Sequence, residues 1–168
     1  MANASEFFLR VLLIGAGATA VMDLWALFLN RCLGIPSLNY AMVGRWAGHL
    51  ARGRLRHEAI GRAVPVPGER ALGWAAHYAI GIVFAAILLA VAGLEWALRP
   101  TFLPALLFGL VSVAAPFLIL QPGMGAGVAA SRTPKPNTAR LRSLMAHTVF
   151  GVGLYLAAWG SALLLARA

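Results

Sequence analysis

Four long hydrophobic runs constrain this chain more than any other feature of its sequence. They cover about residues 9–33, 71–94, 101–120 and 143–165. A helix needs about 20 mainly apolar residues to cross the hydrocarbon core of a bilayer, and each run is close to that length. Backbone groups in lipid must also be hydrogen-bonded internally, which a helix achieves. We therefore expect residues 1–168 to form a single all-α transmembrane domain, an integral membrane four-helix bundle.

The composition excludes an ordinary soluble domain. Of the 168 residues, 61% are hydrophobic and 11% are charged, whereas about a quarter of the residues of a globular protein are charged. The net charge of +9 lies mainly between the hydrophobic runs, which indicates contact with a lipid bilayer and anionic lipid headgroups rather than with nucleic acid. Cys32 is the only cysteine, so an intrachain disulfide and a cysteine metal cluster are excluded. The sequence leaves open whether the protein forms a homo-oligomer.

The distribution of arginine and lysine predicts how the chain crosses the membrane. Six arginines lie between the first two runs and four basic residues lie between the last two, whereas only Arg99 lies between the second and third. Loops rich in these residues stay in the cytoplasm. We therefore expect both basic loops to be cytoplasmic and both termini to lie outside. We also expect the first run to remain uncleaved, because Glu6 precedes it and the run continues well past the signal-like triplet Ala18-Thr19-Ala20.

The segment between the first two runs is predicted to hold one short amphipathic helix. Gly34 and Pro36 end the preceding helix, because glycine fits a C-cap and proline cannot continue a helix. Hydrophobic residues then recur at helical spacing, with basic residues on the other side. The hydrophobic positions are Leu38, Met42, Val43, Trp46 and Leu50, and the basic positions are Arg45, His49 and Arg52. Such a helix lies in the membrane interface with its basic side toward the headgroups, or it caps the end of the bundle.

Two local expectations concern the third run. Residues 95–100 are expected to form a short turn that carries an interfacial tryptophan, Trp96. Pro116 is expected to kink the helix that follows, because proline removes a backbone donor and crowds the preceding turn.

Polar side chains inside the hydrophobic runs are the candidate functional residues. An aspartate at the centre of a membrane helix costs about 2.5–3.5 kcal/mol on insertion scales, so Asp23 is expected to face a partner within the bundle. His77 lies in the second run and His147 in the fourth, each followed four residues later by a glycine. We hypothesise that Asp23 faces His77 or His147, with Tyr78 and Gln121 as further partners. The alternative is that these residues only fix the packing of the helices.

The two histidines leave several chemical roles open. On helices of the same direction they could ligate one metal ion or the two faces of a haem, and Gly81 and Gly151 would give the macrocycle room to approach. Proton transfer and a metal site shared with Asp23 are further roles. Covalent c-type haem is excluded, because the sequence has no Cys-x-x-Cys-His motif. We expect no cofactor, with haem as the alternative.

A glycine-rich segment follows the third run. Gly123, Gly125 and Gly127 alternate with other residues, but no strand is predicted before them, as a dinucleotide-binding loop requires. One interpretation is a close-packed bend. The other is a site for a lipid headgroup or another anion, in which the glycine amides act together with Arg132 and Lys135.

Some of these residues also carry a family resemblance. It rests on Asp23, the segment from Asn39-Tyr40 to Trp46, His77-Tyr78, Gln121-Pro122 with the glycines after it, and His147. Together they resemble a bacterial membrane family known as domain-of-unknown-function family 2938, over nearly the whole chain. The resemblance implies a bacterial inner-membrane protein, and it implies neither an activity nor a catalytic residue.

The predicted function is a class rather than a reaction. We expect an integral inner-membrane protein, more readily non-enzymatic than enzymatic, whose polar cluster binds or passes a small species or a proton. A bis-histidine haem-binding redox protein is one alternative, and a structural scaffold or lipid-interacting protein is another. An enzyme acting on lipid would need a nucleophile, and Ser131 has no G-x-S-x-G context.

Overall fold

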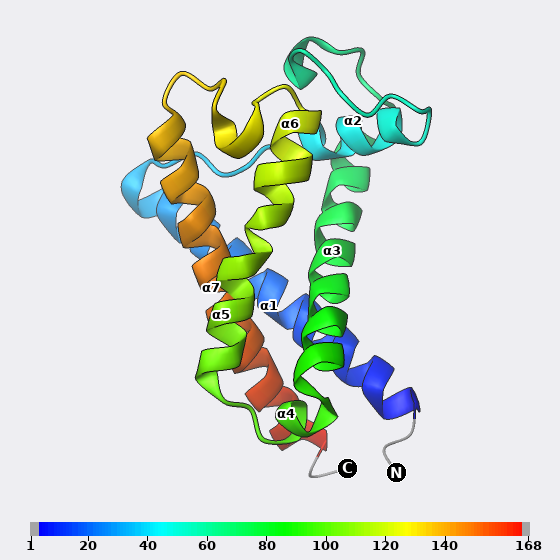
Figure 1. The fold of residues 1–168 in the computed structure, drawn as a ribbon, viewed down its shortest axis with the longest axis vertical. Helices are drawn as coiled ribbons and strands as arrows, with labels where there is room; N and C mark the ends of the chain where they lie inside the picture. Colours follow the sequence, from blue (N-terminus) through cyan, green and yellow to red (C-terminus); the bar gives the residue numbers. More distant parts are fainter. Residues whose placement is uncertain (1–3, 166–168) are drawn as a thin grey trace. The chain divides into compact units, whose positions relative to one another are not determined.

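The computed structural model describes residues 4–165, and all their regular structure is helical (Figure 1). Four helices or helical stretches are long and apolar enough to cross a membrane by length and composition. They are Ala4–Leu33, Glu69–Ala92, Phe102–Gly123 and Pro136–Leu165. The all-α class with four such helices is therefore confirmed.

The described residues divide into two compact units. Unit 1 takes in residues 4–36, 78–112 and 146–165, and unit 2 takes in residues 37–77 and 113–145. Helices α3 (Glu69–Ala92) and α7 (Pro136–Leu165) contribute residues to both units. Whether the units act as a single transmembrane domain stays a prediction.

Helix α1 (Ala4–Leu33) begins earlier than its hydrophobic run and ends where glycine was expected to end it. Glu6 and Arg10, one turn apart, form an ion pair at 3.0 Å, which favours helix beyond the apolar segment. At the other end Gly34 has a φ of 64°, and the Ile35 N–H donates to Leu29 O at 3.1 Å. Gly34 therefore ends the helix in the left-handed conformation that favours glycine after a C-cap.

Helix α7 also begins before its hydrophobic run. Pro136 occupies its first position, where the missing N–H of proline costs nothing because the first-turn donors have no helical partner. Arg140 and Arg142 therefore lie on the helix rather than in a loop, and the Arg140 side chain donates to Ala129 O at 2.8 Å. The predicted start at residue 143 marks the end of the charges, not the end of the helix.

The third helical stretch is interrupted around Pro116, as expected. Helix α5 (Phe102–Ser112) is followed by a π-helix, η2 (Pro116–Leu120), and by the short α6 (Gln121–Gly123). The Gln121 N–H reaches back five residues to Pro116 O. Because proline cannot donate, the regular hydrogen-bond ladder is broken here, and such π-turns often lie at functional sites.

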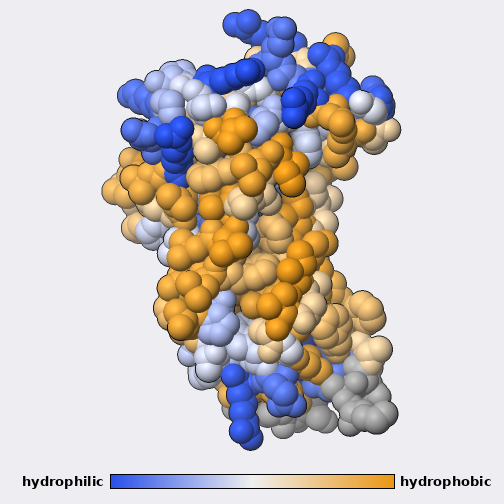
Figure 2. Space-filling view, viewed as in Figure 1, coloured by the Kyte–Doolittle hydropathy of each residue, from blue (hydrophilic) through white to orange (hydrophobic). Residues whose placement is uncertain are grey.

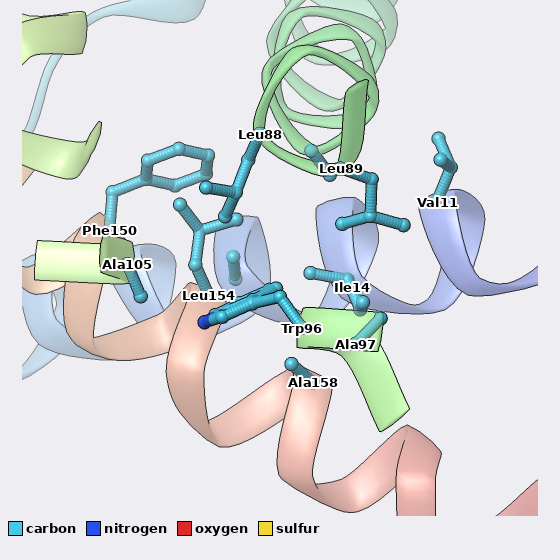
Figure 3. Close-up of a cluster of buried hydrophobic side chains, with 12 residues drawn as sticks. Val11, Ile14, Leu88, Leu89, Trp96, Ala97, Ala105, Phe150, Leu154 and Ala158 are labelled. Atoms are coloured by element: carbon cyan, nitrogen blue, oxygen red, sulfur yellow. The ribbon is translucent and has the colours of Figure 1, made fainter. Parts of the chain in front are cut away.

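The core of unit 1 corrects the expectation for Trp96. Helix α4 (Leu94–Leu98) carries it into a cluster of buried side chains, where it lies among Leu154, Ala97 and Ala158 (Figure 3). Only 7% of Trp96 is exposed, and its indole N–H donates to Thr101 O at 3.2 Å. Trp96 is thus a core residue, because its one polar group is satisfied within the fold.

Small residues set the helix contacts of unit 1. A side chain at Gly15 would overlap the backbone of Ile82, which brings α1 and α3 together. A side chain at Gly109 would meet the backbone of Gly151 and His147 at 2.5–2.6 Å, which brings α5 and α7 together. Close backbone approach through small residues is the usual packing mode of membrane helices.

Unit 2 is organised around α2 (Tyr40–Leu50), which Asn39 caps by accepting a hydrogen bond from the Ala41 N–H. The predicted helix therefore exists, but its basic side is covered. Arg45 and His49 are each only 7% exposed, whereas Arg52 is exposed. Of the two predicted placements, the one in which Arg45 and His49 face the headgroups is therefore wrong. Hydrophilic side chains do gather over α2 and its adjoining loops (Figure 2).

Candidate functional site

Asp23 and Tyr78 form a polar pair inside unit 1. The Tyr78 hydroxyl donates to Asp23 Oδ2 at 3.0 Å, and both residues are partly buried. Asp23 lies eight residues before Arg31 on α1, and Tyr78 lies eight residues after Arg70 on α3. At about 1.5 Å per residue, each lies roughly 12 Å inside the nearest arginine. The two groups are thus at matching depth on their helices.

The contact between α1 and α3 explains why this pair forms. A side chain at Gly81 would overlap the Thr19 hydroxyl, and Thr19 is 1% exposed. The Thr19 hydroxyl donates to Gly15 O at 2.8 Å, so it is satisfied within its own helix. Asp23 follows Thr19 by one turn and Tyr78 precedes Gly81 by about one turn, which continues the same antiparallel contact.

His147 is oriented by Ser112, also in unit 1. The Ser112 hydroxyl lies 2.6 Å from Gly109 O and 2.7 Å from His147 Nδ1. A carbonyl can only accept, so the single hydroxyl proton goes to Gly109 and the Ser112 oxygen accepts from His147 Nδ1–H. In the neutral ring, Nε2 then carries the lone pair.

His77 belongs to an aromatic group of unit 2. Its Nε2 lies 3.0 Å from the Tyr40 hydroxyl, and the ring centroids are 4.4 Å apart. Tyr40 also packs against Trp74, with centroids 4.3 Å apart. A metal bound through His77 Nε2 would have to displace the Tyr40 hydroxyl.

The glycines that follow the two histidines do not leave the space predicted for a macrocycle. Thr19 fills the space beside Gly81, and the backbone of Ala105 and Leu106 lies about 3 Å from where a side chain at Gly151 would begin. These glycines allow helices to approach one another, and that part of the haem argument is wrong.

Gln121 begins α6 directly after the π-helix. Its Nε2 donates to Ser143 Oγ at 3.2 Å. Its Oε1 is buried, and none of the described residues donates a hydrogen bond to it. A buried acceptor without a donor costs free energy.

Of the five residues of the predicted polar cluster, the structure brings Asp23 and Tyr78 together. His77 contacts Tyr40, His147 contacts Ser112, and Gln121 contacts Ser143. The contact of Asp23 with either histidine stays a prediction. Within residues 4–165, no group of three or more His, Cys, Asp or Glu side chains could hold a metal ion.

The glycine-rich segment is a close-packed bend in unit 2. A side chain at Gly123 would meet the Trp46 indole at 2.5 Å, and one at Gly125 would overlap Glu58 O. The amides of residues 124–126 donate to the carbonyls of Leu120, Pro122 and Gln121. Of the three glycines in the predicted anion site, Gly125 therefore has its amide engaged. The side chains of Arg132 and Lys135 are exposed, and the anion site stays a prediction.

Two buried polar contacts of unit 2 were not predicted. Arg45 donates twice to Glu69, both at 2.8 Å, and also donates to Ala63 O at 3.0 Å. Donating these hydrogen bonds to the Glu69 carboxylate raises the pKa of Arg45 above its ordinary value. Glu69 is one of five acidic residues in the whole chain, and no sequence pattern pointed to Arg45 as its partner.

The second missed contact joins His49 and His57. Their Nδ1 and Nε2 atoms are 2.7 Å apart, and each residue is 7% exposed. His57 Nδ1 also donates to Gly123 O at 3.2 Å. No sequence pattern pointed to this pair, because His57 lies in a loop outside any periodic segment.

Comparison with known proteins yields a family but no further relative. A family model described as "Protein of unknown function (DUF2938)" matches residues 12–161. No curated protein and no solved structure matches the chain.

Proposed function

The chain belongs to the DUF2938 family of proteins of unknown function. We propose that it is an integral membrane protein in which Asp23 and Tyr78 form a site that binds and passes a proton. The observation that carries this proposal is the hydrogen bond from the Tyr78 hydroxyl to Asp23 Oδ2, at 3.0 Å. Both groups lie on helices that are long and apolar enough to span a membrane.

The chemistry of the pair supports proton transfer. An ionised carboxylate in hydrocarbon is heavily penalised, so an intramembrane aspartate is either paired or protonated. The Tyr78 hydroxyl stabilises the ionised form by donating to it. When Asp23 takes up a proton, the same hydroxyl can accept from the carboxylic acid, so both protonation states keep a hydrogen bond.

The test is proton flux into vesicles that contain the purified full-length protein. A potassium gradient with valinomycin drives protons inward, and a trapped pH-sensitive dye reports them. We expect flux above that of protein-free vesicles, abolished by Asp23→Asn and reduced by Tyr78→Phe. Ser161→Ala is the matched control, because it removes another buried hydroxyl of unit 1, one that donates to Ala158 O. Wild-type flux no higher than that of empty vesicles would overturn the proposal.

A haem-binding redox protein is the second candidate, and it draws support from His147. The hydroxyl of Ser112 holds this ring with Nε2 carrying the lone pair, which is the form that ligates iron. A visible absorption spectrum separates the two candidates. We expect colourless protein, even when it is purified from cells supplied with a haem precursor. A Soret band that disappears in His147→Ala would instead favour haem.

A further inference from the structure

A pocket in unit 2 lies where α2 and α3 begin. Its lining residues are Leu38, Asn39, Tyr40, Ala41, Arg70 and Trp74, and its volume is about 260 Å³. Leu38 and Asn39 directly precede α2, and Tyr40 and Ala41 begin it. Arg70 and Trp74 lie in the first two turns of α3. The proposed proton site uses none of them.

The polar side of the pocket offers donors and no carboxylate. Among the described residues, none forms a hydrogen bond or an ion pair with the exposed Arg70 side chain. Its neighbour Glu69 is already bound to Arg45 and to the Val66 N–H. Asn39 Oδ1 accepts from the Ala41 N–H, which leaves the Asn39 amide N–H groups as donors. The pocket is therefore suited to an anion.

The remaining wall is hydrophobic and held in place. Trp74 is 38% exposed and packs on Tyr40, whose hydroxyl lies 3.0 Å from His77 Nε2. Leu38 is 57% exposed. A free inorganic anion would leave these apolar surfaces in contact with water, whereas an amphiphile would cover them.

The position of the pocket along α3 favours a membrane lipid as the amphiphile. Arg70 is the last charged residue before the uncharged stretch that extends to Leu94, and Trp74 follows one turn later. In a membrane-spanning α3, Arg70 is level with the headgroups and Trp74 with the region just beneath them, where tryptophan is enriched.

We propose that this pocket binds an anionic phospholipid. The Arg70 guanidinium and the Asn39 amide hold the phosphate oxygens, since arginine presents its donors in a fork that matches phosphate. The glycerol and the start of an acyl chain lie along Trp74 and Leu38. The proposal requires α3 to span the membrane but does not depend on proton transfer at Asp23.

The test measures lipid binding to the full-length protein in detergent by native mass spectrometry. The probes are phosphatidylglycerol, phosphatidylcholine with the same acyl chains, and glycerol phosphate as the soluble headgroup. We expect phosphatidylglycerol to bind more tightly than phosphatidylcholine, and glycerol phosphate to bind weakly. Arg70→Gln should reduce the preference for phosphatidylglycerol about fivefold, as expected for one basic residue at an anionic membrane surface.

Arg54→Gln is the matched control, because it removes the same charge from an exposed residue of unit 2 outside the pocket. Equal losses in Arg54→Gln and Arg70→Gln would show diffuse attraction and overturn the proposal, as would a loss confined to Arg132→Gln. If glycerol phosphate bound as tightly as phosphatidylglycerol, the pocket would be a site for a soluble phosphate, and the lipid proposal would be wrong. Circular dichroism checks that each variant is folded. If Arg70→Gln unfolds, the preference of the wild type for phosphatidylglycerol over phosphatidylcholine and its response to Arg54→Gln and Arg132→Gln still test the proposal, and Arg70→Lys, which keeps the charge, should keep most of that preference.

Discussion

His57 joins the loop after α2 to the bend after the π-helix. Its backbone N–H and its ring Nδ1 both donate to Gly123 O, at 2.9 and 3.2 Å. With the proton on Nδ1, the neutral ring has its lone pair on Nε2, which accepts from His49 Nδ1–H at 2.7 Å. One buried side chain therefore satisfies two groups from distant parts of unit 2.

We predict that His57→Leu destabilises the protein. The substitution leaves the buried His49 Nδ1–H without its acceptor and removes one donor from Gly123 O, at a cost of about 1–3 kcal/mol. The measurement is thermal unfolding in detergent, followed by circular dichroism. Glu58→Gln, at the exposed neighbouring position, should leave the Tm unchanged. An unchanged Tm in His57→Leu would show that the histidine pair contributes nothing to stability.

Helices α2 and α3 meet through two glycines, and this contact places both Arg45 and Tyr40. A side chain at Gly44 would overlap Glu69 O, and a side chain at Gly73 would overlap Tyr40 O. The close approach lets Arg45 reach Glu69 and lets Tyr40 reach His77 and Trp74. The same contact therefore shapes the proposed lipid pocket.

Replacing either glycine with alanine tests this contact. Gly44→Ala and Gly73→Ala should each destabilise the protein by about 1–3 kcal/mol, because the obstructing atoms belong to the backbone and cannot move aside cheaply. Gly160→Ala is the control, since a side chain there meets nothing within 4 Å on a helix that favours alanine. Thermal unfolding of the three variants gives the comparison. If Gly73→Ala behaved like Gly160→Ala, the contact would not be tight in solution.

The four hydrophobic helices suggest a membrane protein, and we propose the orientation that the basic residues favour. Both basic loops are assigned to the cytoplasm, and both ends of the chain are assigned to the outside. The ends themselves, residues 1–3 and 166–168, lie outside the described residues. The sides of the membrane on which Arg70 and Glu6 lie follow from this assignment.

Reporter fusions check the orientation. Fusions after Arg56 and after Lys135 should report the cytoplasm, whereas a fusion between Leu94 and Thr101 should report the other side. Cys32 is free and exposed near the end of α1, so it gives an independent measurement. It should resist an impermeant thiol reagent added to intact cells and react after permeabilisation. Rapid labelling of Cys32 in intact cells would show that the orientation is the reverse of the one proposed.

Much of the fold could be predicted because its causes are local. Hydrophobic runs of bilayer length define the four long helices, and Gly34 ends the first because only glycine adopts its positive φ without strain. Pro116 breaks the third helical stretch because it lacks an N–H. The ends of the helices were predicted less exactly. Helices α1 and α7 begin before their apolar runs, because polar and charged residues can also form helix.

The candidate site was harder to predict, because partners are chosen by distance in space. The sequence by itself determined that Asp23 needs a partner, since a lone carboxylate in hydrocarbon is penalised, and the pairing with Tyr78 depended on how α1 and α3 pack at Gly15 and Gly81. The helical periodicity of α2 showed a basic side, but only the tertiary structure decided that Arg45 would be buried against Glu69. Periodicity states which residues share a face; what covers that face is decided by the rest of the chain.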